Sequence, residues 1–224
     1  EYKDNHQGYI DLIVNEMLPQ IAKEGLADYI DAFCEKVAFS VAETEQIIVA
    51  GAKYGLKAKI HTNQFNCMGG IELCVKHNAL SVDHLEVVND KEIEYLKGSE
   101  TVATLLPSAP FFLSDPYQPG RKLIDEGVAV ALASDYNPGS SPSGNMNFVV
   151  SLACVKLKMT PAEAINAATI NGAFAMELEQ DYGSIAIGKK ANFIITKPIN
   201  SAAFIPYSFG KDTIDQVVIN GKRI

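Results

Sequence analysis

The chain has 224 residues, 47% of them hydrophobic, and its 27 acidic and 19 basic side chains give a formal charge of −8 at pH 7. That length and hydrophobic content allow a sizeable core, as one large α/β domain or one domain with an appendage, and they exclude a disordered chain. The acidic balance argues against a nucleic-acid or anionic-membrane partner, and the sequence has no run of roughly eighteen apolar residues to cross a bilayer.

The cysteines occur without the spacing of a metal site or a redox motif: Cys34, Cys67, Cys74 and Cys154. In an acidic, enzyme-like chain we expect them to be reduced and mostly buried, in a cytosolic compartment. The sequence begins at Glu1, with neither Met nor a signal-like segment, so we expect a processed chain or a piece of a longer protein.

Apolar, strand-like segments alternate with helical segments along the first two thirds of the sequence. The predicted strands cover residues 29–34, 57–61, 81–85, 101–106 and 128–133. The predicted helices cover residues 8–24, before the first strand, and residues 40–54, 70–77, 92–97 and 120–126, between the strands. Strand-then-helix units at spacings of roughly 20 to 28 residues predict a βα repeat with a parallel sheet.

Two of these helices carry boundary signals. Ser40, with Glu43 three residues later, has the capping-box pattern at the start of the helix 40–54. Pro19 lies inside the helix 8–24 and should kink or divide it, because proline lacks an N–H and its ring clashes with the preceding turn.

Beyond residue 143 the alternation ends. Residues 148–158 and 160–176 predict two helices, and the second begins with Thr160 as N-cap, Pro161 at the first position and Glu163 at the third.

The end of the chain predicts a small amount of β-structure. Residues 183–195 are interpreted as a β-hairpin with its turn at 188–190, and residues 214–224 as short strands joined by a turn at 220–221. These strands are too few for a domain, so we expect them to join a small sheet whose other strands lie elsewhere.

Residues 128–141 are the strongest indication of a functional site. Asp135 comes just after the buried strand 128–133, and Pro138 and Gly139 then favour a turn, because proline fixes φ and glycine accepts positive φ. A carboxylate at the C-terminal end of a parallel strand is typical of active sites in α/β proteins. Asp135 therefore anchors the predicted site.

Two histidines occupy equivalent positions. His61 and His84 end their strands, so closing the repeat into a barrel would bring both to the mouth that holds Asp135. Imidazole and carboxylate suit a divalent transition metal, which could acidify a water for hydrolysis. A hydrogen-bonded structural role stays open for both histidines and is the only interpretation for His6 and His77.

Several runs carry a resemblance to a known family. They are Lys-Ile-His-Thr-Asn-Gln-Phe (59–65), Gly-Gly-Ile-Glu-Leu (69–73), Ser-Val-Asp-His-Leu-Glu (81–86), Thr-Leu-Leu-Pro-Ser-Ala (104–109) and Ala-Ser-Asp-Tyr-Asn-Pro-Gly-Ser-Ser (133–141). Together they resemble the metal-dependent amidohydrolase superfamily, and within it the members that open the ring of 4-imidazolone-5-propanoate in histidine degradation. The resemblance covers nearly the whole chain and includes residues 31–35, 183–195 and 205–210.

The resemblance implies a role for each residue at the barrel mouth. His61 and Asp135 match metal ligands, and Asp135 would also accept a proton from the metal-bound water. His84 matches a histidine that faces the substrate and polarises the ring carbonyl. Gln64 stands where many members have a substrate-contacting glutamate, and an amide can hydrogen-bond the ring but cannot act as a base.

The turn after the last barrel strand would also contact the substrate. Asn137, Gly139 and Ser140 match positions that do so through side-chain or backbone groups. Thr62 and Asn63 replace the Ala-Asp often found beside the metal-binding histidine, a change that we expect to be tolerated.

The implied fold is the C-terminal part, about strands four to eight, of a TIM-type (β/α)8 barrel over residues 1–180, followed by strands of a small β-sandwich subdomain over residues 181–224. Members take two further metal ligands from a His-X-His pair, and none occurs in this sequence. We therefore expect the C-terminal half of such an enzyme. Arg121, in a helix after Pro119, fits a structural role, so the arginine for the substrate's propionate is expected in the other half.

The resemblance thus implies one divalent metal ion, zinc or iron, and a small-molecule substrate. For the full-length protein we expect a homodimer, the commonest assembly of soluble enzymes. Two alternatives stay open. One is a deaminase of cyclic amidines on the same scaffold, which the loop 137–140 disfavours. The other is a non-catalytic barrel remnant that serves as an interaction module, for which Gln64 and the absent His-X-His are the support.

Overall fold

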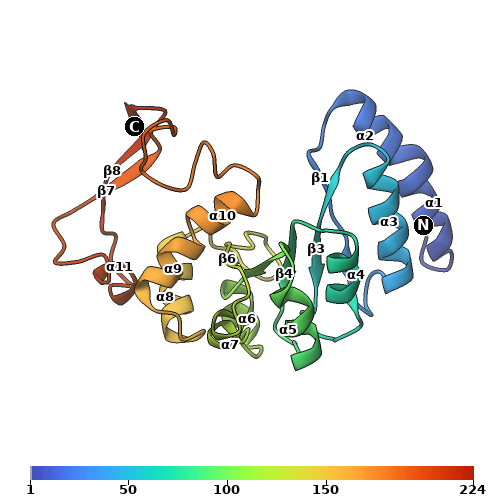
Figure 1. Ribbon diagram of the computed structural model, residues 1–224, viewed down its shortest axis with the longest axis horizontal. Coiled ribbons are helices and arrows are strands. Elements are labelled where there is room, and N and C mark those ends of the chain that lie inside the picture. Colours follow the sequence, from blue (N-terminus) through green and yellow to red (C-terminus); the bar gives the residue numbers. More distant parts are fainter. Residues whose placement is uncertain (1) are drawn as a thin grey trace. The chain divides into compact units, whose positions relative to one another are not determined.

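The computed structural model describes residues 2–224. It divides into two compact units, the first ending at Ala103 and the second comprising Thr104–Ile224 (Figure 1). Each unit is described by itself.

The first unit is built on parallel strands. Strands β1 (Tyr29–Ile30) and β2 (Phe33–Cys34) both pair with β3 (Lys57–Thr62), which pairs in turn with β4 (Ser81–His84). Because β1 and β2 follow the same edge of β3, the predicted strand 29–34 is confirmed, with an interruption at residues 31–32. The carboxyl ends of the strands consequently lie along one edge of the sheet.

Helices cover this sheet and follow the predicted order: α1 (His6–Leu12), the π-helical turn η1 (Ile13–Met17), α2 (Leu18–Glu24), α3 (Val41–Ala52), α4 (Gly70–Lys76) and α5 (Asp90–Lys97). Pro19 does not break the helix, since residues 6–24 are helical without interruption. Directly before the proline the helix widens into η1, where Leu18 donates its N–H to the carbonyl of Ile13. A wider turn accommodates proline, which has no N–H to donate to the helix and whose ring needs space beside the preceding turn.

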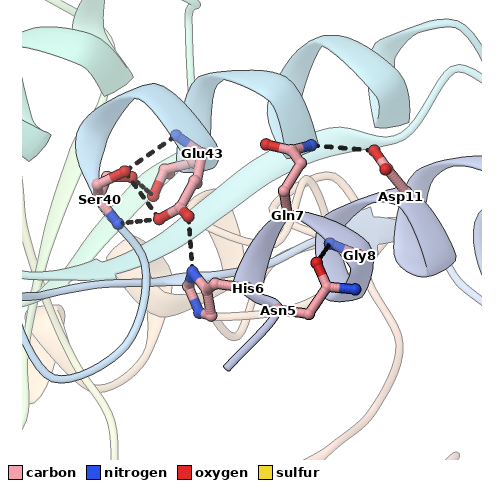
Figure 2. A network of polar contacts seen from close by, with 8 residues as sticks. Asn5, His6, Gln7, Gly8, Asp11, Ser40 and Glu43 are labelled. Atoms are coloured by element: carbon pink, nitrogen blue, oxygen red, sulfur yellow. Dashed lines mark hydrogen bonds and ion pairs between the residues drawn. The ribbon is translucent and has the colours of Figure 1, made fainter. Parts of the chain in front are cut away.

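Helix α3 begins at the predicted capping box. Glu43 donates its N–H to Ser40 Oγ at 3.3 Å, and its Oε2 accepts the N–H of Ser40 at 2.8 Å. Figure 2 shows that His6 adds to this contact, with its Nδ1 2.6 Å from Glu43 Oε1. Asn89 and Glu92 form a second capping box at the start of α5.

Strand β5 (Val102–Leu105) lies at the division between the units. In the first unit, Val102 donates its N–H to the carbonyl of Leu80 at 2.9 Å. In the second, Leu105 accepts the N–H of Ala133 at 3.2 Å, next to strand β6 (Val130–Leu132). Both strands are buried along their whole length, as expected for strands of a parallel sheet.

A short helix that the sequence did not predict follows β5, namely α6 (Ser108–Leu113). It is short and carries Pro110 in its first turn, so it shows neither a long periodic pattern nor an ordinary cap. The predicted helix after it is confirmed as α7 (Gly120–Asp125).

The prediction of one helix over residues 160–176 was wrong in its extent. The helix α8 (Met146–Val155) is followed by two shorter ones, α9 (Pro161–Ala167) and α10 (Ile170–Phe174). Thr169 separates them with φ −125° and ψ −88°, and its Oγ1 donates to the carbonyl of Ile165 at 2.7 Å. A threonine hydroxyl that bonds to the helix backbone competes with the helical hydrogen bonds and favours such a break.

The start of α9 predicts a measurable pH effect. Glu163 accepts two hydrogen bonds from Arg121, at 2.8 and 3.1 Å, and one from the N–H of Thr160. The Arg121 guanidinium is the main reason that the pKa of Glu163 falls to about 2. A carboxylate with a lowered pKa stabilises the fold above its ordinary pKa near 4.5 and loses that effect as the pH falls toward 2.

Glu163→Gln should therefore lower the free energy of unfolding of the full-length protein by about 1 kcal/mol at pH 7, allowing for solvent screening. Urea unfolding at pH 7, 5, 4 and 3 should show this difference shrinking once the pH drops below about 4.5. Glu94→Gln is the control, because the exposed Glu94 forms a weak ion pair with an exposed Lys97 at 3.6 Å. Equal effects of the two substitutions at every pH would contradict the prediction.

The hairpin predicted at residues 183–195 is wrong. Residues 183–192 contain no strand, and β7 (Phe193–Thr196) pairs antiparallel with β8 (Ile214–Ile219), well away in the sequence. Gly183, at φ +85°, passes close to α10, where a side chain would meet Ala173 and Ile170. Gly183 therefore serves close packing rather than a hairpin, whereas a side chain at Gly188, which has φ +93°, would meet nothing within 4 Å.

The predicted hairpin at the end of the chain is confirmed. β8 pairs antiparallel with β9 (Lys222–Arg223), and the turn residues Asn220 and Gly221 have φ +50° and +75°. Positive φ at both positions is the requirement of the two-residue turn for which Asn-Gly is preferred. The short helix α11 (Phe204–Tyr207) lies between β7 and β8 in the sequence and packs on α8.

The cysteines are free thiols, but they are less buried than predicted. Cys34 and Cys74 are buried, whereas Cys154 is half-buried and Cys67 is exposed. Among the helices of residues 2–224, none is long and apolar enough to cross a membrane.

Candidate active site

The first unit brings His61 and His84 together at the carboxyl edge of its sheet. His61 lies near the end of β3 and His84 ends β4, and their ring centroids are 5.5 Å apart. His61 is half-buried, whereas His84 is 4% exposed. The ring of Phe33, opposite His61 in the sheet, lies 6.3 Å from the ring of His84. The two predicted histidines therefore belong to one cluster.

A carboxylate orients the ring of His61. Its Nδ1 is 2.9 Å from Oδ1 of Asp31, which lies in the gap between β1 and β2. A carboxylate that accepts the Nδ1 proton leaves the lone pair of the neutral ring on Nε2. Histidines that bind metals in proteins commonly have this arrangement. The surroundings of His61 therefore suit a metal ligand.

Two residues before His61, Lys59 begins a polar network on the same face of β3. Lys59 donates to Ser81 Oγ at 2.9 Å, and Ser81 donates to Asp83 Oδ1 at 2.8 Å. Burial lowers the pKa of Lys59, while the charges of Asp83 and Asp31 act in the opposite direction. The lysine thus places a positive charge near the carboxylate that orients His61.

The loop after β3 carries Gln64, which is buried at 9% exposure. Asn63 precedes it with φ +59°, and its side chain donates to the carbonyl of Val87 at 2.8 Å and to Glu92 Oε1 at 2.9 Å. Thr62 and Asn63 are both buried, and their side chains form hydrogen bonds in the interior.

A buried carboxylate fixes the other side of this loop. Glu35 is fully buried, and its Oε1 accepts the N–H groups of Phe65 and Asn66 at 2.8 and 3.1 Å. Its Oε2 accepts the side-chain amide of Asn66 at 2.9 Å. Three hydrogen bonds offset the cost of burying the charge and hold the segment that follows Gln64.

The second unit gathers the remaining predicted residues in one turn after β6. Asp135 has φ +53°, and Ser140 donates its hydroxyl to Asp135 Oδ2 at 2.9 Å. Asn137 Oδ1 accepts the N–H groups of Gly139 and Ser140, each at 2.8 Å. Asn137 Nδ2 donates to the carbonyl of Asp135 and to Ser140 Oγ, each at 2.7 Å. The turn therefore holds the Asp135 carboxylate in a defined orientation.

The residues interpreted as structural have structural partners. His77 Nε2 is 2.8 Å from Glu45 Oε1, as His6 is close to Glu43. Arg121 binds Glu163 and lies 2.9 Å from Asp125, so its guanidinium serves the helices α7 and α9. These contacts agree with the interpretation of all three residues as structural.

Four polar residues of the first unit were missed as site residues: Asp31, Glu35, Glu86 and Glu92. The motif runs 31–35 and 81–86 contain three of them, which was the available signal. Their roles depend on which side chains face one another across the sheet, and a motif run does not give that.

Comparisons with known proteins show the family to which the chain belongs. The amidohydrolase family profile matches residues 8–224. The chain is 60% identical over 224 residues to the imidazolonepropionase of Christiangramia forsetii and 62% identical to that of Flavobacterium psychrophilum, with 100% of this chain and 54% of each relative covered. The chain thus spans about half the length of these curated relatives.

The fold is similar to that of a solved adenosine deaminase from Xanthomonas campestris with bound zinc. The TM-score is 0.77 at 16% sequence identity, over 92% of this chain and 55% of that one. At this identity the similarity concerns the fold alone. It agrees with the predicted α/β class with a parallel sheet.

Proposed function

Because the chain belongs to the amidohydrolase family, we propose that the full-length protein hydrolyses the cyclic amide of 4-imidazolone-5-propanoate to N-formimidoyl-L-glutamate. The observation that carries this proposal is the high identity to imidazolonepropionases along the whole chain. The fold proposed with it is the C-terminal part of a (β/α)8 barrel over residues 1–180, with sandwich strands over residues 181–224.

The metal site is the first element of the proposal. His61 and Asp135 are proposed as ligands of one divalent ion, zinc or iron, with further ligands from outside this chain, since the sequence has no His-X-His. The Asp31 carboxylate at Nδ1 of His61 supports this role. When bound, such a metal polarises a carbonyl and acidifies a water.

The chain's own residues would perform the remaining steps. Asp135 accepts the proton that the attacking water loses. His84 hydrogen-bonds the ring carbonyl and stabilises the negative charge that develops on its oxygen. Gln64 hydrogen-bonds the ring and cannot serve as a base, so proton transfer falls to Asp135 and His84.

The turn after β6 is proposed to contact the substrate through Asn137, Gly139 and Ser140. The four hydrogen-bonding positions of the Asn137 amide are filled within the turn, so its shape is set before substrate binds. A preformed turn would reduce the entropy lost on binding.

The test is to express the complete open reading frame that contains this sequence and to follow the ultraviolet absorbance of 4-imidazolone-5-propanoate with and without a chelator. We expect chelation to remove more than 90% of the rate, roughly the loss typical of an essential metal, and zinc or iron to restore it. Elemental analysis of the purified protein then identifies the metal.

Two outcomes would contradict the proposal. A metal-loaded protein that leaves the imidazolone unchanged would favour a deaminase of cyclic amidines, to be tested on guanine and cytosine. An inactive protein that binds no metal would favour the non-catalytic interpretation. We also propose that the full-length protein is a cytosolic homodimer. Light scattering coupled to size-exclusion chromatography measures its molar mass and so tests the dimer.

A further inference from the structure

We propose that Glu86 is a positioning residue for His84. Its buried carboxylate meets Nδ1 of the His84 ring across a strained turn, and it thereby fixes the direction in which Nε2 points. The inference rests on the proposed role of His84 in the function above, and it adds a residue that acts through the histidine.

The two side chains form a closely buried pair. His84 Nδ1 lies 3.3 Å from Glu86 Oε1, and the side chains are 5% and 2% exposed. A buried carboxylate is unfavourable unless a charged or polar group compensates it, and an apolar side chain would pack there at lower cost. The carboxylate at this position therefore calls for an explanation beyond packing.

The backbone between the two residues is unusual. His84 has φ +91° and Leu85 has φ +64°, in the region that residues other than glycine rarely adopt. In a continued strand, residues 84 and 86 would stand parallel on one face, about 6.5 Å apart. The left-handed bend ends the strand and brings the carboxylate against the ring.

The surrounding structure holds this bend in place. Leu85 is fully buried and donates its N–H to the carbonyl of Thr62 at 3.4 Å, and Val87 donates to the carbonyl of Asn63 at 2.9 Å. Strained residues persist where the neighbouring structure fixes them, and they concentrate at functional sites. The same bend thus connects His84 to the loop that carries Gln64.

The chemical consequence follows from the ring's two nitrogens. When Nδ1 donates to Glu86, the ring cannot rotate freely, and Nε2 keeps one direction. Nε2 donates to the carbonyl oxygen of the substrate when it carries a proton as well, and the Glu86 carboxylate then balances the charge of the imidazolium. An orienting carboxylate behind a catalytic histidine has this role in hydrolytic triads. His61 and Asp31 show the same arrangement, so each histidine of the cluster has a carboxylate at Nδ1.

The test compares Glu86→Leu and Glu86→Gln in the full-length, metal-loaded protein. We expect Glu86→Leu to lower kcat about 10- to 100-fold with KM changed less than about 3-fold, since orienting partners of histidines have effects of this size. Glu86→Gln keeps an acceptor oxygen of the same reach, so it should retain more of the rate. In a His84→Ala background, Glu86→Leu should have almost no further effect.

A second readout does not depend on the substrate. In protein labelled with 15N-histidine, the Nδ1 proton of His84 should give an exchange-protected, low-field resonance that is assigned by its loss in His84→Ala. Glu86→Leu should remove this resonance. Glu45→Leu, which removes the carboxylate at His77, is the matched control and should leave both the resonance and kcat unchanged.

Multiplicative losses in the double variant, or a change confined to KM, would overturn the proposal. Absence of the protected resonance in the unsubstituted protein would overturn it as well, whichever substrate the enzyme takes. If the imidazolone is not hydrolysed but the resonance behaves as expected, the proposed function fails and the positioning of His84 by Glu86 stands.

Discussion

Replacing Asp135 by asparagine should reduce kcat for imidazolone hydrolysis by about 10³-fold or more, because one substitution removes both a negatively charged ligand and the proposed proton acceptor. The amide has nearly the same shape as the carboxylate but is neutral and cannot take up the proton. Its oxygen can still accept the hydroxyl of Ser140, now 2.9 Å from Asp135 Oδ2, so the turn should keep its shape. The fall in rate would then report chemistry and not misfolding.

The measurement combines the decrease of imidazolone absorbance with the metal content per subunit and the thermal midpoint. The control is Asp181→Asn, which removes an exposed carboxylate 3.5 Å from Lys190 and should leave the rate unchanged. A near-wild-type rate in Asp135→Asn would refute its assignment as ligand and base.

His84→Ala should lower kcat by about 10²- to 10⁴-fold while the metal stays bound, because a positioned acid–base or oxyanion-stabilising group has an effect of this size. His84 is buried beside Glu86, and the carboxylate would lose its ring partner in the variant. Some loss of stability is therefore expected as well, and kcat must be measured on protein shown to be folded.

The matched control is His77→Ala, which removes a ring that also contacts a glutamate but lies outside the cluster. It should keep the wild-type kcat. If His84→Ala instead loses the metal, His84 belongs to the ligand set, and its proposed contact with the substrate carbonyl is wrong.

The elements that the sequence predicted correctly are those with local causes. The strand 102–105 is a short, mostly apolar run that is buried throughout, and the strand 57–62 alternates buried with more exposed side chains. Both patterns are local along the chain. The capping boxes at Ser40 and Thr160 are fixed by residues three positions apart, and both are present in the structure.

One error arose where a partner distant in the sequence decides the outcome, and another where a local side-chain hydrogen bond interrupts a helix. Strand β7 pairs with β8 and not with its neighbouring segment. Phe193 and Ile194 lie opposite the β-branched Val218 and Val217, whereas residues 183–192 include two glycines and two lysines and form no strand. The helix 160–176 divides at Thr169, whose hydroxyl bonds the helix backbone.

For the proposed site, the sequence by itself determined the candidate residues and their places: His61 and His84 at strand ends, and Asp135 before a turn of small polar residues. It determined this because the strand pattern, the turn residues and the family motifs are all local along the chain. The sequence did not reveal what orients these groups.

Only the tertiary structure decided that Asp31 and Glu86 each lie at Nδ1 of a histidine, and that Glu35 holds the loop after Gln64. For Asp31 and Glu35, the parallel register brings β2 beside β3 and sets which side chains meet across the sheet. For Glu86, two left-handed residues bend the chain back toward the ring. Register and bend depend on packing that involves many residues at once, and for this reason no single stretch of sequence specifies them.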